Sequence, residues 1–412
     1  MKQSLIYIVA SIILVTGCSS NSDFSNRNNT NTTTEERYDL SYLITNSSKI
    51  EKEIENSNYS NVTLADTFTV VIPNTENVAT FDLIKKDKMK TEDIKKYLNT
   101  IIPVVFDESI NLNTELRFIS DSIPRNDSLP YPKSLPLLSD YLNKTISDIN
   151  TYVLGDKNYY IELQPYGTIN SLNDGTAQKF DKIEKECAGL YFATDDHIIE
   201  KIYNNVDCND EYKLLDENIS VSSCAKNTEE FISNYLSFNS NTELKPAICA
   251  AKAIEMDDDT YGLSFSITCS YKGILFDTYK TENDSSFTEK SLSTKERKKY
   301  NLMPGYAFVF TSNKINNFND YIRNYDIVSL KEYNQILTPV KAMDICATSL
   351  SSSISFEISS CELKYLSRYT NDEATSLNVY PVWRFQSINT NDNLNYVMYV
   401  NAVNGDFDYY TY

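Results

Sequence analysis

Apolar positions beyond the first sixty residues follow two different periods, and the two periods alternate along the chain. Strand-like runs occupy Thr67–Pro73 and Thr80–Lys86. A spacing of three and four residues, typical of a helix with one apolar face, follows Thr91, which we predict to be an N-cap. A second such helix is predicted from Asn227 or Thr228. The alternation predicts an α+β fold with several small antiparallel sheets, each packed with one or two helices.

The clearest hairpin of the sequence runs from Ile248 to Met256, turns at Asp257–Asp259 and returns from Tyr261 to Tyr271. A turn centred on Asp259 would place Cys249 opposite Cys269, with small or apolar side chains along one face. We therefore predict a disulfide or a close buried thiol pair between Cys249 and Cys269. The three adjacent acids are interpreted as a turn, because calcium requires ligands spaced around the ion.

The last segment of the chain has the most regular pattern. Thr338 is predicted to be the N-cap and Pro339 the first residue of a helix that continues to Leu350. Three strand-like runs follow, and Asn404–Gly405 is a turn signal. In the middle run, Trp383 is predicted to lie in the core. Arg384, on the opposite face of the strand, is predicted to face solvent or a partner.

These patterns divide the chain into a signal peptide, a tether and three folded segments. The flexible tether is predicted from a stretch rich in Ser, Asn and Thr that has little apolar surface to bury. The predicted boundaries are 1–17 for the signal peptide, 18–60 for the lipidated cysteine and tether, 61–225 for an N-terminal α+β region, 226–326 for a helix with a β-meander, and 327–412 for a helix with an antiparallel sheet.

The N-terminus has the features of an export signal. Lys2 is followed by Leu5–Val15, a mostly apolar and uncharged run that is too short to span a bilayer. It ends in Val15-Thr16-Gly17-Cys18, which resembles the lipobox of bacterial lipoproteins. The resemblance implies cleavage before Cys18 and a diacylglycerol on its thiol, with palmitate-type chains that hold the protein on the outer side of the cell membrane.

Charge and composition narrow the chemistry. The net charge of −19 disfavours nucleic acid and anionic lipid headgroups as direct partners. The basic run Lys295–Lys299 is interpreted as a solvated face. Only nine glycines occur, and no glycine-rich phosphate loop is found. The single histidine, His197, excludes the usual multi-histidine zinc sites; it is interpreted as an exposed residue at a helix start, with a role as a lone ligand or general base left open. We predict no metal, no cofactor and no catalytic residue.

The other cysteines show no CxxC spacing, so zinc knuckles and thioredoxin-like redox motifs are not indicated. In an exported protein, disulfides are the usual alternative. The cysteines besides Cys18 are Cys187, Cys208, Cys224, Cys249, Cys269, Cys346 and Cys361. Because their number is odd, at least one of them cannot form a disulfide within the chain.

The segment from Val328 to Tyr412 resembles a PepSY-type module, on the strength of LTPVKAMDICATSL, SSCELKYL and YVMYVNAVNGDF. The intervening YPVWRF resembles the variant in YycI- and YycH-like extracytoplasmic regulators. Its closing turn departs from the family's usual acidic pattern, and the chain has a lipid signal where those regulators have a transmembrane helix. The lipobox, the Asn- and Ser-rich tether, the early TFTVVIP and KTEDIKKYL runs and the later hairpin YGLSFSITCSYKGILFD resemble, over the whole chain, a family of clostridial-type lipoproteins of unknown function. The resemblance to PepSY-type modules implies that the protein binds or restrains partners such as peptidases.

We therefore expect a membrane-anchored extracytoplasmic lipoprotein of the cell envelope that is not an enzyme and acts as a binding or regulatory module. Its expected partners are the membrane, through the lipid on Cys18, and an envelope protein or peptide. The alternative is a carboxylate-dependent envelope hydrolase, since glycosidases need only two well-placed acids. A deep cleft with two carboxylates about 5–10 Å apart and aromatic walls would favour the hydrolase. A shallow groove without such a pair would favour binding.

Overall fold

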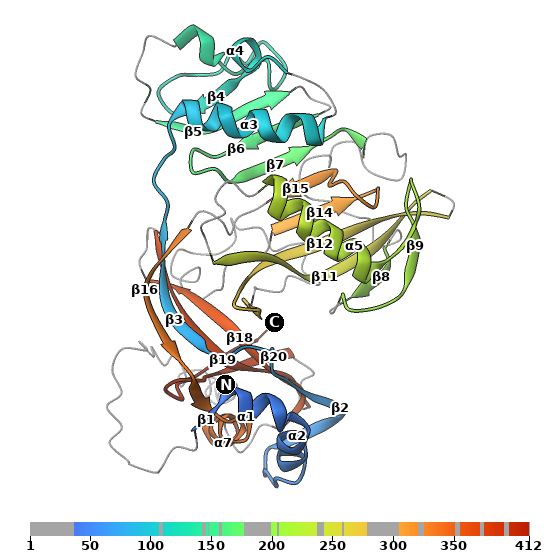
Figure 1. Ribbon diagram of the computed structural model, residues 1–412, viewed down its shortest axis with the longest axis vertical. Coiled ribbons are helices and arrows are strands. Elements are labelled where there is room, and N and C mark those ends of the chain that lie inside the picture. Colours follow the sequence, from blue (N-terminus) through green and yellow to red (C-terminus); the bar gives the residue numbers. More distant parts are fainter. Residues whose placement is uncertain are drawn as a thin grey trace, which may run out of the picture. The chain divides into compact units, whose positions relative to one another are not determined.

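The computed structural model describes residues 37–106, 110–141, 146, 148–155, 159–176, 199–203, 206–236, 243–257, 259–277, 305–319, 325–350, 355–370, 375–390 and 395–411. The predicted signal peptide, Cys18, Cys187, His197 and the basic run Lys295–Lys299 lie outside these residues. Among the described residues strands predominate, in two large sheets and two small two-stranded ones (Figure 1). The fold is therefore compatible with α+β, but its main sheets are larger than the sequence indicated.

The part of the predicted tether that the structure describes is folded. Arg37–Asp39 forms strand β1, followed by helices α1 (Leu40–Thr45) and α2 (Ser47–Glu55). Strand β1 pairs with β17 (Gln335–Leu337). Leu40, Leu43, Ile50 and Ile54 are fully or almost fully buried. The prediction of a flexible chain up to residue 60 was wrong from Arg37 onward, because these few apolar residues share helix faces and bury them against the rest of the fold.

The ten-stranded sheet collects strands from three parts of the chain. Its order is β4 (Arg117–Ser120), β5 (Ile149–Gly155), β6 (Tyr160–Leu163), β7 (Ile169–Asn173), β15 (Asn317–Asn319), β14 (Gly305–Val309), β12 (Thr260–Tyr271), β11 (Leu244–Asp257) and β8 (Ile199–Tyr203), with β13 (Ile274–Leu275) also pairing with β12. A separate small sheet pairs β9 (Glu211–Lys213) with β10 (Asn218–Ser220).

Two helices share the core of this sheet (Figure 1). They are α3 (Thr91–Val105) and α5 (Val221–Phe231), which continues as a π-helical turn over Ile232–Leu236. The shorter elements are α4 (Leu112–Glu115) and a 3-10 turn at Leu138–Tyr141. The predicted N-caps were wrong. Lys90 occupies the N-cap position of α3 and makes no side-chain capping bond there, whereas the Ser220 hydroxyl caps α5 by accepting a hydrogen bond from the Ser223 amide.

The predicted hairpin between β11 and β12 is present, but its register differs. Asp257 pairs with Thr260, and Asp259 has a φ of 60° in the turn. Cys269 lies opposite Pro246, and Cys249 falls in a β-bulge, where its thiol contacts the Ser266 carbonyl oxygen at 3.4 Å. The predicted pairing of Cys249 with Cys269 is therefore wrong. None of the cysteines that the structure describes is joined in a disulfide.

The seven-stranded sheet has the order β16 (Tyr325–Tyr333), β3 (Val78–Lys85), β19 (Ser376–Asn389), β18 (Phe356–Tyr369) and β2 (Val62–Val71). Strand β20 (Asn395–Asn401) also pairs with β19, and β21 (Phe407–Thr411) pairs with β20. Strands β2 and β3 come from the predicted N-terminal region, so residues 61–225 and 327–412 do not form independent sheets.

The C-terminal helix is confirmed. Helix α7 spans Pro339–Ser349, and the Thr338 hydroxyl accepts a hydrogen bond from the Lys341 amide at 3.0 Å. Cys346 and Met343 of α7 are fully buried in the same core as Trp383. The prediction for Trp383 is also confirmed, and its indole N–H donates to the Leu337 carbonyl oxygen at 2.8 Å.

The prediction for Arg384 was wrong. Its side chain is 6% exposed, and its Nε atom lies 3.0 Å from Oδ1 of Asp277, whose side chain is 8% exposed. The guanidinium also lies 3.7 Å from Glu362 and donates to Gln386 at 2.8 Å. The face of β19 opposite the α7 core is therefore also covered, and strand alternation alone does not indicate this.

Candidate functional site

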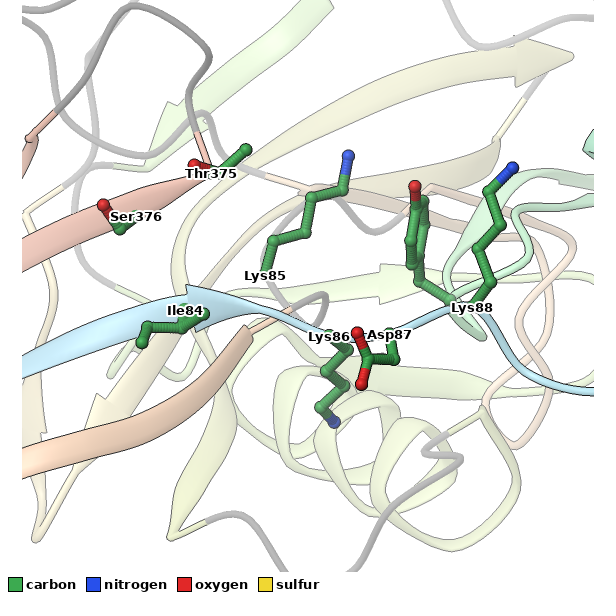
Figure 2. Close-up of a pocket in the computed structure, with 8 residues that line it drawn as sticks. Ile84, Lys85, Lys86, Asp87, Lys88, Thr375 and Ser376 are labelled. Atoms are coloured by element: carbon green, nitrogen blue, oxygen red, sulfur yellow. The ribbon is translucent and has the colours of Figure 1, made fainter. Parts of the chain in front are cut away.

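A recess of about 520 Å³ lies where strand β3 ends (Figure 2). Three segments that are distant in sequence form its wall: the end of β3 with the residues after it, the turn between β6 and β7, and the start of β19. Its lining residues are Ile84, Lys85, Lys86, Asp87, Lys88, Tyr166, Thr375 and Ser376.

Backbone hydrogen bonds fix the segment that carries most of these side chains. The Lys85 amide donates to the Thr375 carbonyl oxygen at 2.9 Å, which continues the pairing of β3 with β19. The Met89 amide donates to the Pro165 carbonyl oxygen at 2.7 Å, just before α3 begins. Residues 85–89 are thus anchored at both ends, to β19 and to the β6–β7 turn. A binding site held by main-chain bonds on both sides needs little reorganisation to accept a ligand.

The three lysines of the recess have different surroundings. The Lys85 ammonium lies 4.4 Å from the centroid of the Tyr166 ring, at cation–π distance. The Lys86 ammonium lies 3.8 Å from Asp326, and that of Lys88 donates to the Ile149 carbonyl oxygen at 3.1 Å. Figure 2 shows Lys85 and Lys88 projecting to one side of the segment, and Lys86 and Asp87 to the other.

The remaining polar groups of the lining are hydroxyls, apart from one carboxylate. Tyr166, Thr375 and Ser376 carry the hydroxyls, and the Ser376 hydroxyl is hydrogen-bonded to that of Thr370. Asp87 carries the carboxylate. Ammonium and hydroxyl groups donate hydrogen bonds to anions, so this arrangement can bind an acidic group. A lining with one carboxylate lacks the pair of acids that a glycosidase requires.

The site residues expected from sequence are not brought to this recess. Cys18 lies outside the described residues, and Cys249 and Cys269 occupy β11 and β12 without lining the recess. The described part of the chain holds no group of three or more histidine, cysteine, aspartate or glutamate side chains placed to hold a metal ion. Among the helices that the structure describes, none has the length and apolar character needed to cross a bilayer.

The recess was not predicted from the sequence, although one signal was present. Lysine occupies three of the four positions from Lys85 to Lys88, in a chain with a net charge of −19. Tyr166, Thr375 and Ser376 carry no comparable signal, because only the folded chain brings them to the end of β3.

Comparison with known proteins finds similarity among solved structures. No family model matches the chain, and no curated protein matches it. An uncharacterized protein from Eubacterium rectale ATCC 33656 is similar in structure, with a TM-score of 0.48 and 11% identity over 88% of this chain and 98% of its own. The Bacillus megaterium YpeB C-terminal domain has a TM-score of 0.30 and 10% identity, over 79% of this chain and 99% of its own.

Proposed function

We propose that the chain is a lipid-anchored extracytoplasmic lipoprotein that binds an envelope partner without catalysing a reaction on it. The observation that carries the proposal is the lining of the recess at the end of β3. Three ammonium groups and three hydroxyl-bearing side chains surround it, with one carboxylate among them. Such a lining provides hydrogen-bond donors for a ligand and lacks two opposed acids.

The location and the regulatory role rest on sequence. Lys2, the apolar run Leu5–Val15 and the lipobox-like residues before Cys18 support a lipid anchor on the outer side of the cell membrane. The PepSY-like assignment of the C-terminal segment rests on its sequence motifs, and the succession of α7 and antiparallel strands is compatible with it. A module of this class would act by holding or restraining a partner protein or peptide.

The hydrolase alternative is disfavoured by the way two acids are held around Arg384. Asp277 and Glu362 both contact the Arg384 guanidinium, at 3.0 and 3.7 Å. Burial alone would raise the pKa of Glu362, but Lys364 and Arg384 outweigh it and the pKa is lowered. A general acid for glycoside cleavage needs a raised pKa. This pair is therefore arranged as an internal ion network.

A charge reversal in the recess tests the proposed function. Full-length protein is immobilised and exposed to solubilised envelope, and the amount of partner that it retains is measured. We expect Lys85→Glu to lower the affinity for the partner by about tenfold, because the new carboxylate would repel the acidic group of the ligand. Lys96→Glu on α3, an exposed residue outside the recess, provides the matched control and should leave retention unchanged. Equal retention by wild type and both variants would show that the recess is not the binding site.

A further inference from the structure

We infer that the recess recognises the free C-terminal carboxylate of a peptide, with an apolar last residue beside Ile84. This inference rests on the proposed binding function and names the chemistry of the ligand. Four features of the recess carry it: its local charge, the position of the Lys85 ammonium, the neutral donors next to it, and the exposed apolar side chain at its edge.

The local charge of the recess is opposite to that of the molecule. Lys85, Lys86 and Lys88 outnumber Asp87 along the lining, whereas the chain as a whole carries a net charge of −19. Acidic ligands are repelled by most of such a surface and attracted only where lysines gather. The recess is therefore a place where an anionic group can be held specifically.

Lys85 is the lysine best placed to bind the anion. Lys86 lies near the Asp326 carboxylate, and Lys88 donates to a main-chain oxygen. The Lys85 ammonium instead lies over the Tyr166 ring, which holds the charge in position without neutralising it. An ammonium held by a ring retains its capacity to donate to a carboxylate.

A carboxylate fits this site better than a phosphate. The donors next to Lys85 are neutral hydroxyls, so one ammonium can balance a monoanion but not a dianion. A phosphate monoester also carries close to two negative charges, so the acidic molecule would repel it more strongly than a monoanion. Charge balance therefore favours one carboxylate on one ammonium.

The edge of the recess indicates what else the ligand carries. Ile84 lines the recess with 46% of its surface exposed, so it offers apolar contact area at the edge of the recess. A C-terminal residue carries its carboxylate and its side chain on one α-carbon. The neighbouring residues Lys85 and Ile84 can therefore contact the two groups at the same time. The volume of about 520 Å³ lies in the range of small-ligand sites and suits the last few residues of a peptide.

Fluorescence anisotropy with a labelled tripeptide tests the inference. The probe is fluorescein-Ala-Ala-Leu, as the free acid and as the C-terminal amide, titrated with full-length protein in detergent. We expect the acid to bind at least about tenfold more tightly than the amide, because charge-assisted hydrogen bonds are the stronger ones. Lys85→Gln should remove this preference, and Lys96→Gln should keep it.

Competition by acetate and by inorganic phosphate, at matched ionic strength, distinguishes a carboxylate site from a phosphate site. Acetate should displace the free-acid probe at lower concentration than inorganic phosphate does. Stronger displacement by phosphate, equal binding of acid and amide, absence of binding by either, or an unchanged preference in Lys85→Gln would overturn the inference. None of those results would contradict the proposed function, which is binding without catalysis. Release of cleaved envelope fragments would contradict the proposed function, but it would not contradict the preference for a free C-terminal carboxylate.

Discussion

Trp383 and Arg384 are neighbours on β19, and both are buried. Alternation along the strand correctly assigned Trp383 to the core beneath α7. It could not assign Arg384, because the burial of the second face depends on Asp277, which is distant in sequence. The guanidinium is stable there only because carboxylates and an amide surround it.

Removal of this buried charge should be costly. We expect Arg384→Met to lower the free energy of unfolding by about 3 to 5 kcal/mol, since Asp277 would remain buried without its cation. Urea denaturation of the variant measures this loss. The matched control is Lys49→Met, which breaks a surface pair with Glu53 whose side chains are 65% and 50% exposed and should cost no more than about 0.5 kcal/mol. Equal losses in the two variants would contradict the buried ion pair.

At the scale of elements, α7 is the best-predicted part of the fold, because its signals are local. Thr338 supplies the cap and Pro339 the first-turn geometry. We expect Thr338→Ala to cost about 1 kcal/mol of unfolding free energy, and Thr338→Ser to cost much less. Thr348→Ala, at the exposed end of the same helix, is the control. An unchanged urea midpoint for Thr338→Ala would show that the capping bond is not formed.

The hairpin of β11 and β12 was predicted from the local apolar pattern, but that pattern does not determine how the two strands are aligned. A register shift of two residues leaves the same side chains on the core face, so the apolar pattern fits both registers equally. The turn decides between them, because Asp257 pairs with Thr260 and the strands differ from the predicted register from there on. The bulge at Cys249 then shifts the register by one more residue.

Thiol labelling tests the observed register. Cys249 is partly exposed and Cys269 is 2% exposed, so native protein should be alkylated at Cys249 and protected at Cys269. Denaturation without reductant should expose both to labelling. Mass spectrometry of peptides from each state provides the measurement. A mass corresponding to a Cys249–Cys269 disulfide, lost on reduction, would refute this register.

The molecule as a whole is rich in buried tyrosine, and this sets an alkaline limit to its stability. Burial is the main cause that raises the pKa of Tyr380 to about 12, with Arg368 opposing and Asp408 adding to the rise. In the unfolded chain the pKa is near 10, so the folded state holds its proton more tightly. The stabilisation is complete below pH 10 and is lost as the pH rises towards 12.

The size of this effect follows from the shift. We expect Tyr380 to contribute about 2 kcal/mol to the decline in unfolding free energy between pH 10 and 12. Urea unfolding across that range should show a smaller decline in Tyr380→Phe than in wild type, with measurements at pH 8 as the common baseline. Parallel declines would mean that Tyr380 ionises alike in both states.

Sheet assembly was the least predictable feature at this scale. Strand β2 pairs in parallel with β18, and β15 inserts between β14 and β7, across sequence separations that no local period encodes. The recess depends on the same long-range pairings, because Lys85 and Thr375 meet only through β3 and β19. Elements with local signals were therefore predictable, and the site formed between them was not.

Binding without catalysis is tested most directly by a count of turnovers. Full-length protein is incubated with an excess of purified envelope material, and released fragments are counted per protein molecule by mass spectrometry. We expect saturable retention and fewer than about one fragment released per protein molecule, because the recess has one carboxylate where acid–base cleavage of glycosides needs two. Repeated turnover that is lost in Asp87→Asn would contradict it.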